Sequence, residues 1–368
     1  MRFPEFSGEW KSIKLGDALK LKGGYAFKSE KFQDSGVPVV RISNLPQNSY
    51  SVDLSDCVYY ECGNYQNYTV KNGDLLIAMS GATTGKTAIY RYDYPAYLNQ
   101  RVGLFAPKEL VHNQFLYPIV ESKTFISQLG SKLVAGAQPN ISSQDIETIA
   151  VGLPSKEEQI KIAHLFELLN QKIETQSKII EEQETLLRSL RHKIYSRVQA
   201  ESQCTIADVL CYEQPTKYLV TDTDYTDDDS QVPVLTANKA FILGYTTENF
   251  GIYDKGPCII LDDFTLDCKY VDFKFKVKSS AIKILRAKAK TNLRFIFEYF
   301  RFLALNTTEH RRHYIAEIEP MSILLPSNEE IDRIARLFTA LDERLEVARK
   351  ELKILESQKM YMLQKMFI

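Results

Sequence analysis

The sequence lacks several features that would place it in a membrane or an oxidising compartment. No apolar run approaches the roughly 18–20 residues that a membrane-spanning helix needs, and the first ten residues are too polar for a signal peptide. The six cysteines stand apart without a C-x-x-C pair, so we expect neither a zinc site nor a disulfide framework. Together these absences predict a protein of the reducing cytoplasm.

The chain also lacks an excess of either charge and any catalytic motif. Its 46 Lys and Arg residues oppose 47 Asp and Glu residues, which excludes a uniformly basic coat but allows a local basic face. No G-x-S-x-G, H-E-x-x-H or G-x-G-x-x-G motif occurs, and the five histidines are scattered. We therefore expect no enzyme activity, cofactor or metal site. The length of 368 residues, 44% of them apolar, suggests two domains.

The most informative feature present is an internal repeat with an offset of 172 residues. LPSKEE at 153–158 returns as LPSNEE at 325–330, and ten of the twenty-one positions from 153 to 173 are identical without a gap. Ser155 and Ser327 are followed three residues later by Glu158 and Glu330, which is the capping-box pattern of a helix start. Both copies are therefore predicted to begin a helix.

Each predicted helix continues without Pro or Gly for more than thirty-five residues, with apolar side chains at steps of four and three. This heptad pattern favours a coiled-coil pair, and two long surface helices packed on their own domains are the alternative. Gln176, Gln183 and Lys359 interrupt the pattern. The apolar seam consists of Ile162, Phe166, Leu169, Ile173, Ile180, Leu187, Leu190 and Ile194 in the first helix, and of Ile334, Phe338, Leu341, Leu345, Leu352, Leu355 and Met362 in the second.

The segments before the two helices, which we name the first globule (residues 1–152) and the second globule (199–324), resemble divergent copies of each other. VPVV at 37–40 has a counterpart in VPVL at 232–235, GDLLI at 73–77 in GPCII at 256–260, and FLY at 115–117 in FIF at 295–297. Short β-branched and aromatic runs predict mixed α and β structure. The expected fold is α+β: two globules, each followed by a long helix at 153–198 and 325–368.

The segment GATTGKT at 81–87 resembles a nucleotide-binding P-loop, but only three residues separate its glycines where a P-loop has four. The residues after it are typical of a strand. We therefore predict a strand-to-strand turn with Thr83, Thr84 and Lys86 exposed at its tip. An NTPase that uses this segment is an alternative.

Basic residues gather in the second globule, where nine Lys or Arg residues face a single acid, Asp272, between positions 269 and 294. Such segregation is typical of a phosphate-binding face. The alternation KFKVK at 274–278 predicts a strand with its lysines on one side, and an ordinary solvated strand face is the alternative. The candidate contacts are Lys269, Lys274, Lys276, Lys278, Lys283, Arg286, Lys288, Lys290, Arg311 and Arg312 in the second globule, and Lys22, Lys28, Arg41, Thr83, Thr84, Lys86, Arg91 and Arg101 in the first.

Several motifs resemble the specificity (S) subunits of Type I restriction–modification systems. They are RFPEF at 2–6 with Trp10 and KLGD at 14–17, GDLLIAMSGATTGKT at 73–87, QPNIS at 138–142 and the LPSKEEQI tract at 153–160. VLTAN at 234–238 with ILGY at 242–245 resembles a second variety of the same recognition domain. Two departures are Ile331, where Gln is expected, and the absence of a Gly-Lys-Thr turn after Ile260.

The resemblance implies that each globule is a target-recognition domain for one half of a bipartite double-stranded DNA site. The two helices would pack as an antiparallel coiled coil and set the spacing between the halves. Two methyltransferase (M) subunits would bring S-adenosylmethionine and catalysis, and restriction (R) subunits would bring ATP and cleavage. A coiled-coil interaction scaffold without DNA binding is the alternative from another class.

Overall fold

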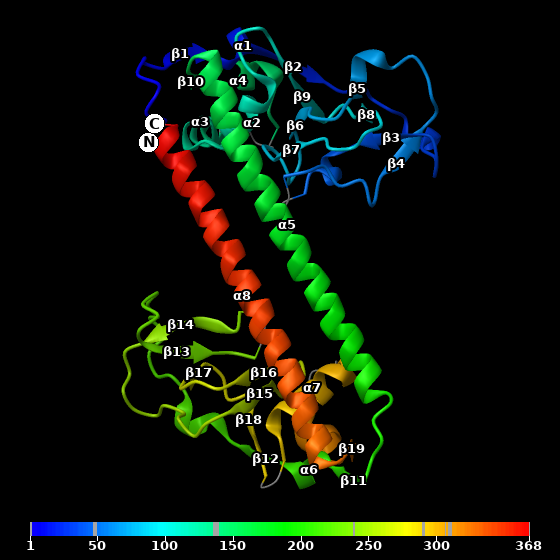
Figure 1. Cartoon of the computed structure of the whole chain (residues 1–368), viewed down its shortest axis with the longest axis vertical. Coiled ribbons are helices and arrows are strands. Elements are labelled where there is room, and N and C mark those ends of the chain that lie inside the picture. Colours follow the sequence, from blue (N-terminus) through cyan, green and yellow to red (C-terminus); the bar gives the residue numbers. More distant parts are fainter. Residues whose placement is uncertain are drawn as a thin grey trace. The chain divides into compact units, whose positions relative to one another are not determined.

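The computed structural model describes residues 2–46, 50–134, 140–237, 240–288, 291–305, 307 and 311–367. The chain forms two compact units, of which the first is Met1–Ile179 with Arg349–Ile368 and the second is Ile180–Ala348. Helices α5 (Lys156–Tyr195) and α8 (Asn328–Met366) each belong to both units (Figure 1). Within the described residues, no helix is long and apolar enough to cross a membrane.

The first unit is built from two sheets and several short helices. Strand β1 (Lys11–Lys14) pairs antiparallel with β10 (Ala150–Leu153), which leads directly into α5. One sheet has the order β2-β9-β6-β7, with β2 (Leu19–Gly23), β6 (Leu75–Ala78), β7 (Thr87–Ile89) and β9 (Val102–Pro107). The other has the order β4-β3-β8-β5, with β3 (Val37–Val40), β4 (Val58–Tyr60), β5 (Thr69–Val70) and β8 (Ala96–Leu98). The helices are α1 (Leu15–Ala18), α2 (Leu116–Glu121), α3 (Lys123–Val134) and α4 (Ser143–Glu147).

The second unit repeats this plan with different loops. Strand β11 (Ser202–Thr205) pairs antiparallel with β19 (Ser322–Leu325), which leads into α8. One sheet has the order β12-β18-β15-β16, with β12 (Leu210–Glu213), β15 (Cys258–Asp262), β16 (Cys268–Val271) and β18 (Ile282–Ala287). The other has the order β14-β13-β17, with β13 (Val232–Leu235), β14 (Ile242–Thr246) and β17 (Lys276–Val277). Its helices are α6 (Ile206–Val209), α7 (Leu293–Leu303) and a π-helical turn (Tyr314–Ile318).

In the described residues the two globules share a strand order, as their sequence correspondences predict, except that β5 has no counterpart in the second globule. The VPVV and VPVL segments are β3 and β13, and each pairs in parallel with a later strand, β8 or β17. Gly73 and Gly256 both adopt positive φ angles, of 88° and 82°, just before the equivalent strands β6 and β15. The backbone N–H groups of Ile141 and His313, 172 residues apart, donate to the carbonyl oxygens of Met79 and Asp263. The 172-residue offset of the helices therefore already holds at Ile141 and His313, near the end of each globule, but not at their acceptors.

At the starts of α5 and α8, one of the two hydrogen bonds of each predicted capping box is present. The hydroxyl oxygens of Ser155 and Ser327 accept hydrogen bonds from the backbone N–H groups of Glu158 and Glu330, at 3.3 and 3.2 Å. The carboxylates do not return to the cap residues. Glu158 is fully buried and binds the Arg2 guanidinium at 2.5 and 2.7 Å, and Glu330 pairs with Arg333 at 2.6 Å.

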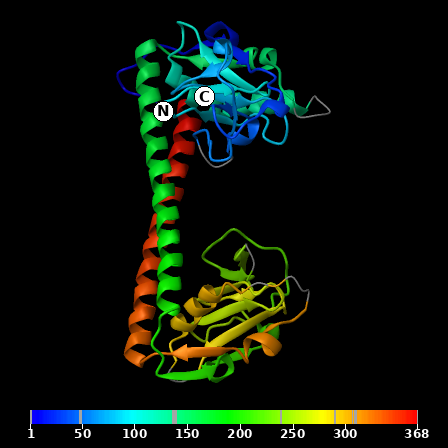
Figure 2. The same ribbon diagram turned by 90° about the vertical axis from the view of Figure 1, so that its right-hand side faces the viewer.

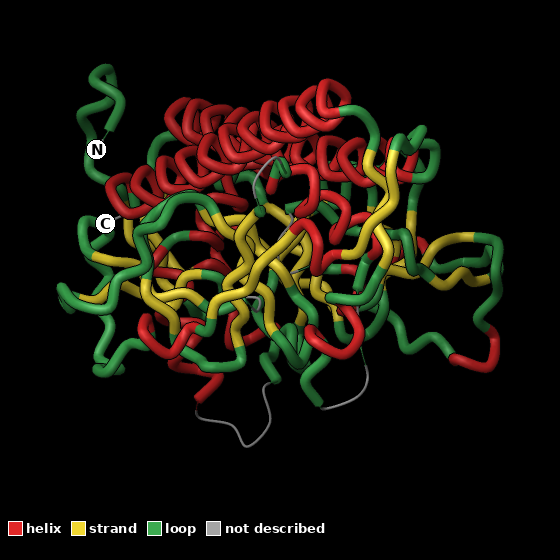
Figure 3. Tube along the Cα trace, turned by 90° about the horizontal axis from the view of Figure 1, so that it is seen from below, coloured by secondary structure: helices red, strands yellow, loops and turns green. Residues whose placement is uncertain are grey.

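All fifteen seam residues predicted from the heptad pattern are buried or half-buried. In the first unit, Ile162 and Phe166 of α5 share one apolar core with Leu363 of α8, and in the second unit Leu187 of α5 shares a core with Phe338 of α8. The start of one helix therefore packs with the end of the other in each unit, so the pair is antiparallel (Figures 1 and 2). Figure 3 shows the helices, strands and loops of the described residues in a further view. Each helix end packs on both the other helix and a globule, so the predicted helix pair is confirmed over two helices that pack separately on their own domains.

Candidate nucleic-acid interface

The segment at 81–87 forms the turn between β6 and β7, as predicted, and strand β7 follows it where a P-loop would have a helix. Gly81 and Gly85 take positive φ angles of 81° and 87°, and the N–H of Gly85 donates to the Ala78 carbonyl at 2.8 Å. This geometry gives no support to the NTPase alternative. The expectation of an exposed tip is wrong for three side chains, because Thr83, Thr84 and Lys86 are half-buried.

The basic candidates of the first globule differ in their exposure. Lys22, Lys28 and Arg101 are exposed. Arg41 is half-buried and donates to the carbonyl oxygen of Asp56 at 3.3 Å. Arg91 is also half-buried, and its side chain contacts helix α5.

The Arg91 guanidinium forms an ion pair with Glu167 of α5, with two N···O distances of 2.9 Å. Desolvation opposes ionisation of Glu167, but the hydrogen bond and positive charge of Arg91, together with a hydrogen bond from Gln171, outweigh it and lower the pKa of that carboxyl. The pair therefore joins the first globule to the start of α5. The Arg91 guanidinium therefore already has a carboxylate partner within the protein.

Tyr25, which stands between Lys22 and Lys28 in the sequence, belongs to an aromatic group in the first globule. The Tyr25 side chain is 39% exposed, and its ring centroid lies 5.0 Å from that of Phe27 and 5.2 Å from those of Tyr65 and Tyr68. Partly exposed aromatic rings beside cations are a surface on which nucleobases can stack. The four residues come from two segments that are distant in the sequence, 25–27 and 65–68, so no local sequence pattern marks them as one group.

The ten basic candidates of the second globule differ in their exposure, as far as the structure describes them. Lys274, Lys278, Lys288, Arg311 and Arg312 are exposed, Lys269 and Arg286 are half-buried, Lys276 and Lys283 are buried, and Lys290 lies outside the described residues. Several of the accessible groups have internal partners. Arg311 pairs with Glu317 at 2.5 Å, Arg286 lies 3.8 Å from Glu213, and Lys288 donates to the Ala207 carbonyl.

The prediction that the lysines of 274–278 share one solvent-facing side is wrong for Lys276. Strand β17 is only two residues long, and both of its side chains are buried. The Lys276 ammonium is fully enclosed, where it pairs with Glu248, donates to the Phe250 carbonyl at 2.8 Å and lies 4.3 Å from the centre of the Phe250 ring. An internal carboxylate thus compensates this charge, and Lys276 is not available to a phosphate.

Lys283 is the second buried lysine that the charge pattern placed on the surface. Its ammonium lies 3.5 Å from a carboxylate oxygen of Asp263 and 4.9 Å from the centre of the Tyr212 ring. The other oxygen of Asp263 accepts the backbone N–H groups of His313 and Tyr314, at 3.1 and 2.8 Å. This buried group holds the π-helical turn against β15, so Lys283 has a structural role.

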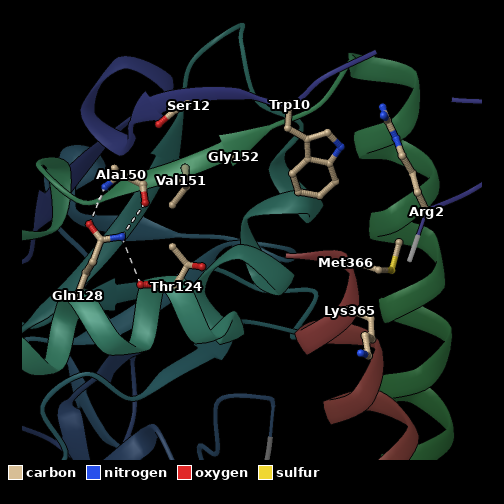
Figure 4. Close-up of a pocket in the computed structure, with 10 residues that line it drawn as sticks. All are labelled: Arg2, Trp10, Ser12, Thr124, Gln128, Ala150, Val151, Gly152, Lys365 and Met366. Carbon is tan, nitrogen blue, oxygen red and sulfur yellow. Dashed lines mark hydrogen bonds between the residues drawn. The ribbon is translucent and has the colours of Figure 1, made fainter. Parts of the chain in front are cut away.

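An open pocket of about 510 Å³ lies in the first unit where the start of the chain meets the end of α8 (Figure 4). Trp10, Gly152 and Met366 line it, and Gln128 of α3 binds both backbone groups of Ala150 in β10, at 2.8 and 3.0 Å. Gln128 thereby holds α3 against β10. In the part of the chain that the structure describes, no three His, Cys, Asp or Glu side chains are grouped to hold a metal.

Comparison with known proteins gives one consistent family. Residues 7–185 match the model of the Type I restriction modification DNA specificity domain. The specificity subunit of the Type I restriction enzyme EcoR124I/EcoR124II from Escherichia coli is 42% identical over 156 residues, which are 38% of this chain and 38% of that protein. A putative specificity subunit, MjaX, from Methanocaldococcus jannaschii is 22% identical over 403 residues, covering 96% of this chain and 92% of the relative.

The fold has a counterpart among solved structures. The Type I restriction-modification S subunit from M. genitalium superposes with a TM-score of 0.71 at 14% identity, covering 100% of this chain and 99% of that one. The segments matched in the first three curated relatives span only 38%, 42% and 28% of those proteins. On the family model and these relatives, residues 7–185 belong to the DNA specificity domains of Type I restriction–modification systems, and the whole chain, with its two β-rich units and packed long helices, shares the fold of a solved specificity subunit.

Proposed function

We propose that this chain is the DNA-reading subunit of a Type I restriction–modification complex. The first globule (1–152) and the second globule (199–324) act as target-recognition domains, each reading one half of a bipartite site. The helices at 153–198 and 325–368 set the gap between the halves. The observation that carries this proposal is the doubled fold, in which the same strand order occurs twice and each copy leads into its own long helix.

The partners follow from the same assignment. Two M subunits supply S-adenosylmethionine and methyl transfer, and R subunits, where the system has them, supply ATP hydrolysis and cleavage. The complex works in the cytoplasm on double-stranded DNA, and the present chain contributes recognition without chemistry.

The exposed cations are the best candidates for phosphate contacts. They are Lys22, Lys28 and Arg101 in the first globule and Lys274, Lys278 and Arg312 in the second. Exposed Lys and Arg side chains lose little solvation energy when they meet a phosphate, and they displace counterions from the DNA. Tyr25 adds an aromatic surface in the first globule.

Methylome sequencing tests the proposal. A host that expresses this chain with its M subunit should acquire methylated sites made of two fixed half-sites and a gap of constant length, and a host with the M subunit alone should not. One continuous recognition sequence, or the same methylation without this chain, would contradict the proposal. Absence of DNA binding by the purified complex at moderate salt would favour the scaffold alternative.

A further inference from the structure

A buried ion pair joins the end of α8 to the first globule. The Lys359 side chain is 3% exposed, and its ammonium lies 2.7 and 2.8 Å from the two carboxylate oxygens of Glu121, at the end of α2. The ammonium also lies 3.5 Å from the centre of the Tyr50 ring, and the Tyr117 hydroxyl donates to Glu121 at 3.0 Å. One turn further along α8, Leu363 is buried in the apolar core of the same unit.

A different buried ion pair joins the end of α5 to the second globule. The Nε of Arg191 lies 2.8 Å from a carboxylate oxygen of Glu298 in α7, and the two side chains are 5% and 0% exposed. Arg294 binds the other oxygen of Glu298 at 2.7 Å. One turn earlier on α5, Leu187 is 2% exposed and belongs to the apolar core of the second unit.

The repeat relates these positions to one another in a crossed manner. Helices α5 and α8 begin at Lys156 and Asn328, so the 172-residue offset holds in the structure. It makes Leu187 equivalent to Lys359, and Arg191 equivalent to Leu363. On α8 the charged residue, Lys359, comes one turn before the apolar one, whereas on α5 the charged residue, Arg191, comes one turn after it. The acid in each globule, Glu121 or Glu298, lies where it meets the charged residue of its own helix end.

This reversed order of charged and apolar residues matters when two copies of the chain meet. Because the two halves share a fold, a globule of one copy could otherwise pack with the helix end of the same half from the other copy. If the α5 end of a second copy took the place of the α8 end on the first globule, Leu187 would face Glu121, and Arg191 would enter the apolar site of Leu363. On the second globule, Lys359 would enter the apolar site of Leu187. Breaking a buried pair leaves uncompensated buried charges, which is far more costly than the pair is stabilising.

We propose that these crossed buried charges restrict each globule to the helix end of the other half, so that the chain rejects symmetric pairing with a second copy of itself. The partner excluded is an identical chain offering the like helix end. The proposal concerns pairing and holds whatever the globules bind, so its failure and the failure of DNA reading are separate results.

Exchanging the four residues tests it in the full-length chain. In L187K/R191L/K359L/L363R each helix end carries the pattern that suits the globule of its own half. Within one chain, the far end of a helix cannot pack on the globule from which that helix starts. Two chains should therefore assemble, each globule packing with the matching helix end of the other chain. We expect light scattering after gel filtration to give twice the mass found for the wild type, with helicity by circular dichroism retained. The matched control L186K/R188L/L337R/K353L makes the same types of change at exposed positions of the same helices and should keep the wild-type mass.

A second variant preserves the test if the exchange prevents folding. E121L/K359L/R191L replaces the ionic discrimination by apolar residues, a change that folded proteins often tolerate, while Arg294 still binds Glu298. When two differently tagged full-length copies are coexpressed, this variant should copurify as mixed pairs at least tenfold more than the wild type. The proposal would be overturned if the exchanged chain kept both the mass and the stability of the wild type. It would also be overturned if the apolar variant copurified only at the wild-type level.

Discussion

The ammonium nitrogen of Lys276 lies 2.5 Å from a carboxylate oxygen of Glu248, inside the second globule. The other oxygen of Glu248 accepts the Thr221 hydroxyl at 2.6 Å and the backbone N–H groups of Thr221 and Asp222 at 2.9 and 2.8 Å. Desolvation alone would raise the pKa of Glu248, but the hydrogen bond from Lys276, together with those from Thr221 and Asp222, outweighs it and lowers that pKa to about 2. One carboxylate thus joins β17, the end of β14 and the loop at 221–222.

This arrangement predicts an acid-sensitive contribution to stability. A carboxyl whose pKa is lowered by folding stabilises the protein above its ordinary pKa of 4.5, and it loses that contribution as the pH falls toward about 2. At pH 6 we expect E248Q to be less stable than the wild type by about 1–3 kcal/mol, since a buried ammonium loses its counter-charge. Urea unfolding at pH 6, 4 and 3 should show the difference shrink as the pH falls. A difference that stays constant with pH would assign the loss to packing instead.

Phosphate binding by the second globule predicts a loss that is independent of sequence. In a complex with the M subunit, K274A/K278A should weaken binding to target and non-target DNA alike. It should also lower the slope of log K against log salt by up to about one unit for each lost contact. Fluorescence anisotropy across a salt series measures both effects. A changed base preference with an unchanged slope would show that these lysines read bases.

Arg91 and Arg101 of the first globule form a matched pair of arginines with different expected roles. R91A removes the ion pair with Glu167, so the free energy of unfolding should fall by about 1 kcal/mol while the salt slope stays constant. R101A removes an exposed cation, so it should lower the salt slope and leave the free energy of unfolding unchanged. Urea unfolding and the same anisotropy series, applied to both variants, separate the two roles. A reduced salt slope in R91A would show that Arg91 contacts DNA.

The sequence predicts the helices and the repeat well because both leave regular signals. The 172-residue offset, the Ser caps and the heptad seam correspond to α5 and α8, and VPVV and VPVL mark equivalent strands. The site is predicted less well, because a lysine within a basic run has the same letter whether solvent or a carboxylate surrounds it. Lys276 and Lys283 find partners at Glu248 and Asp263, and Arg91 finds one 76 residues away. Only tertiary structure brings such partners together.

The spacing role of the helices predicts the effect of lengthening them. Gln176 of α5 contacts Glu351 of α8 at 3.1 Å, so the two helices of the pair can be extended at facing positions. Four residues inserted after Ser177 and four after Lys350 add about 6 Å to each helix and rotate the part of the helix beyond the insertion by about 40°. Two base pairs of DNA extend about 6.8 Å, and one base pair rotates the duplex by about 35°.

The recognised gap should therefore grow by one or two base pairs, while both half-sites keep their sequences. The insertions shift the heptad frame in both helices, so some loss of stability is expected as well. Methylome sequencing with the M subunit present reads the gap and the half-sites together. The same four residues placed between Gln199 and Ala200, beyond the end of α5, serve as the control and should leave the gap unchanged. Full methylation with the original gap, or a new half-site sequence, would mean that the helices do not set the spacing, since a rigid pair of helices transmits added length to whatever its ends carry.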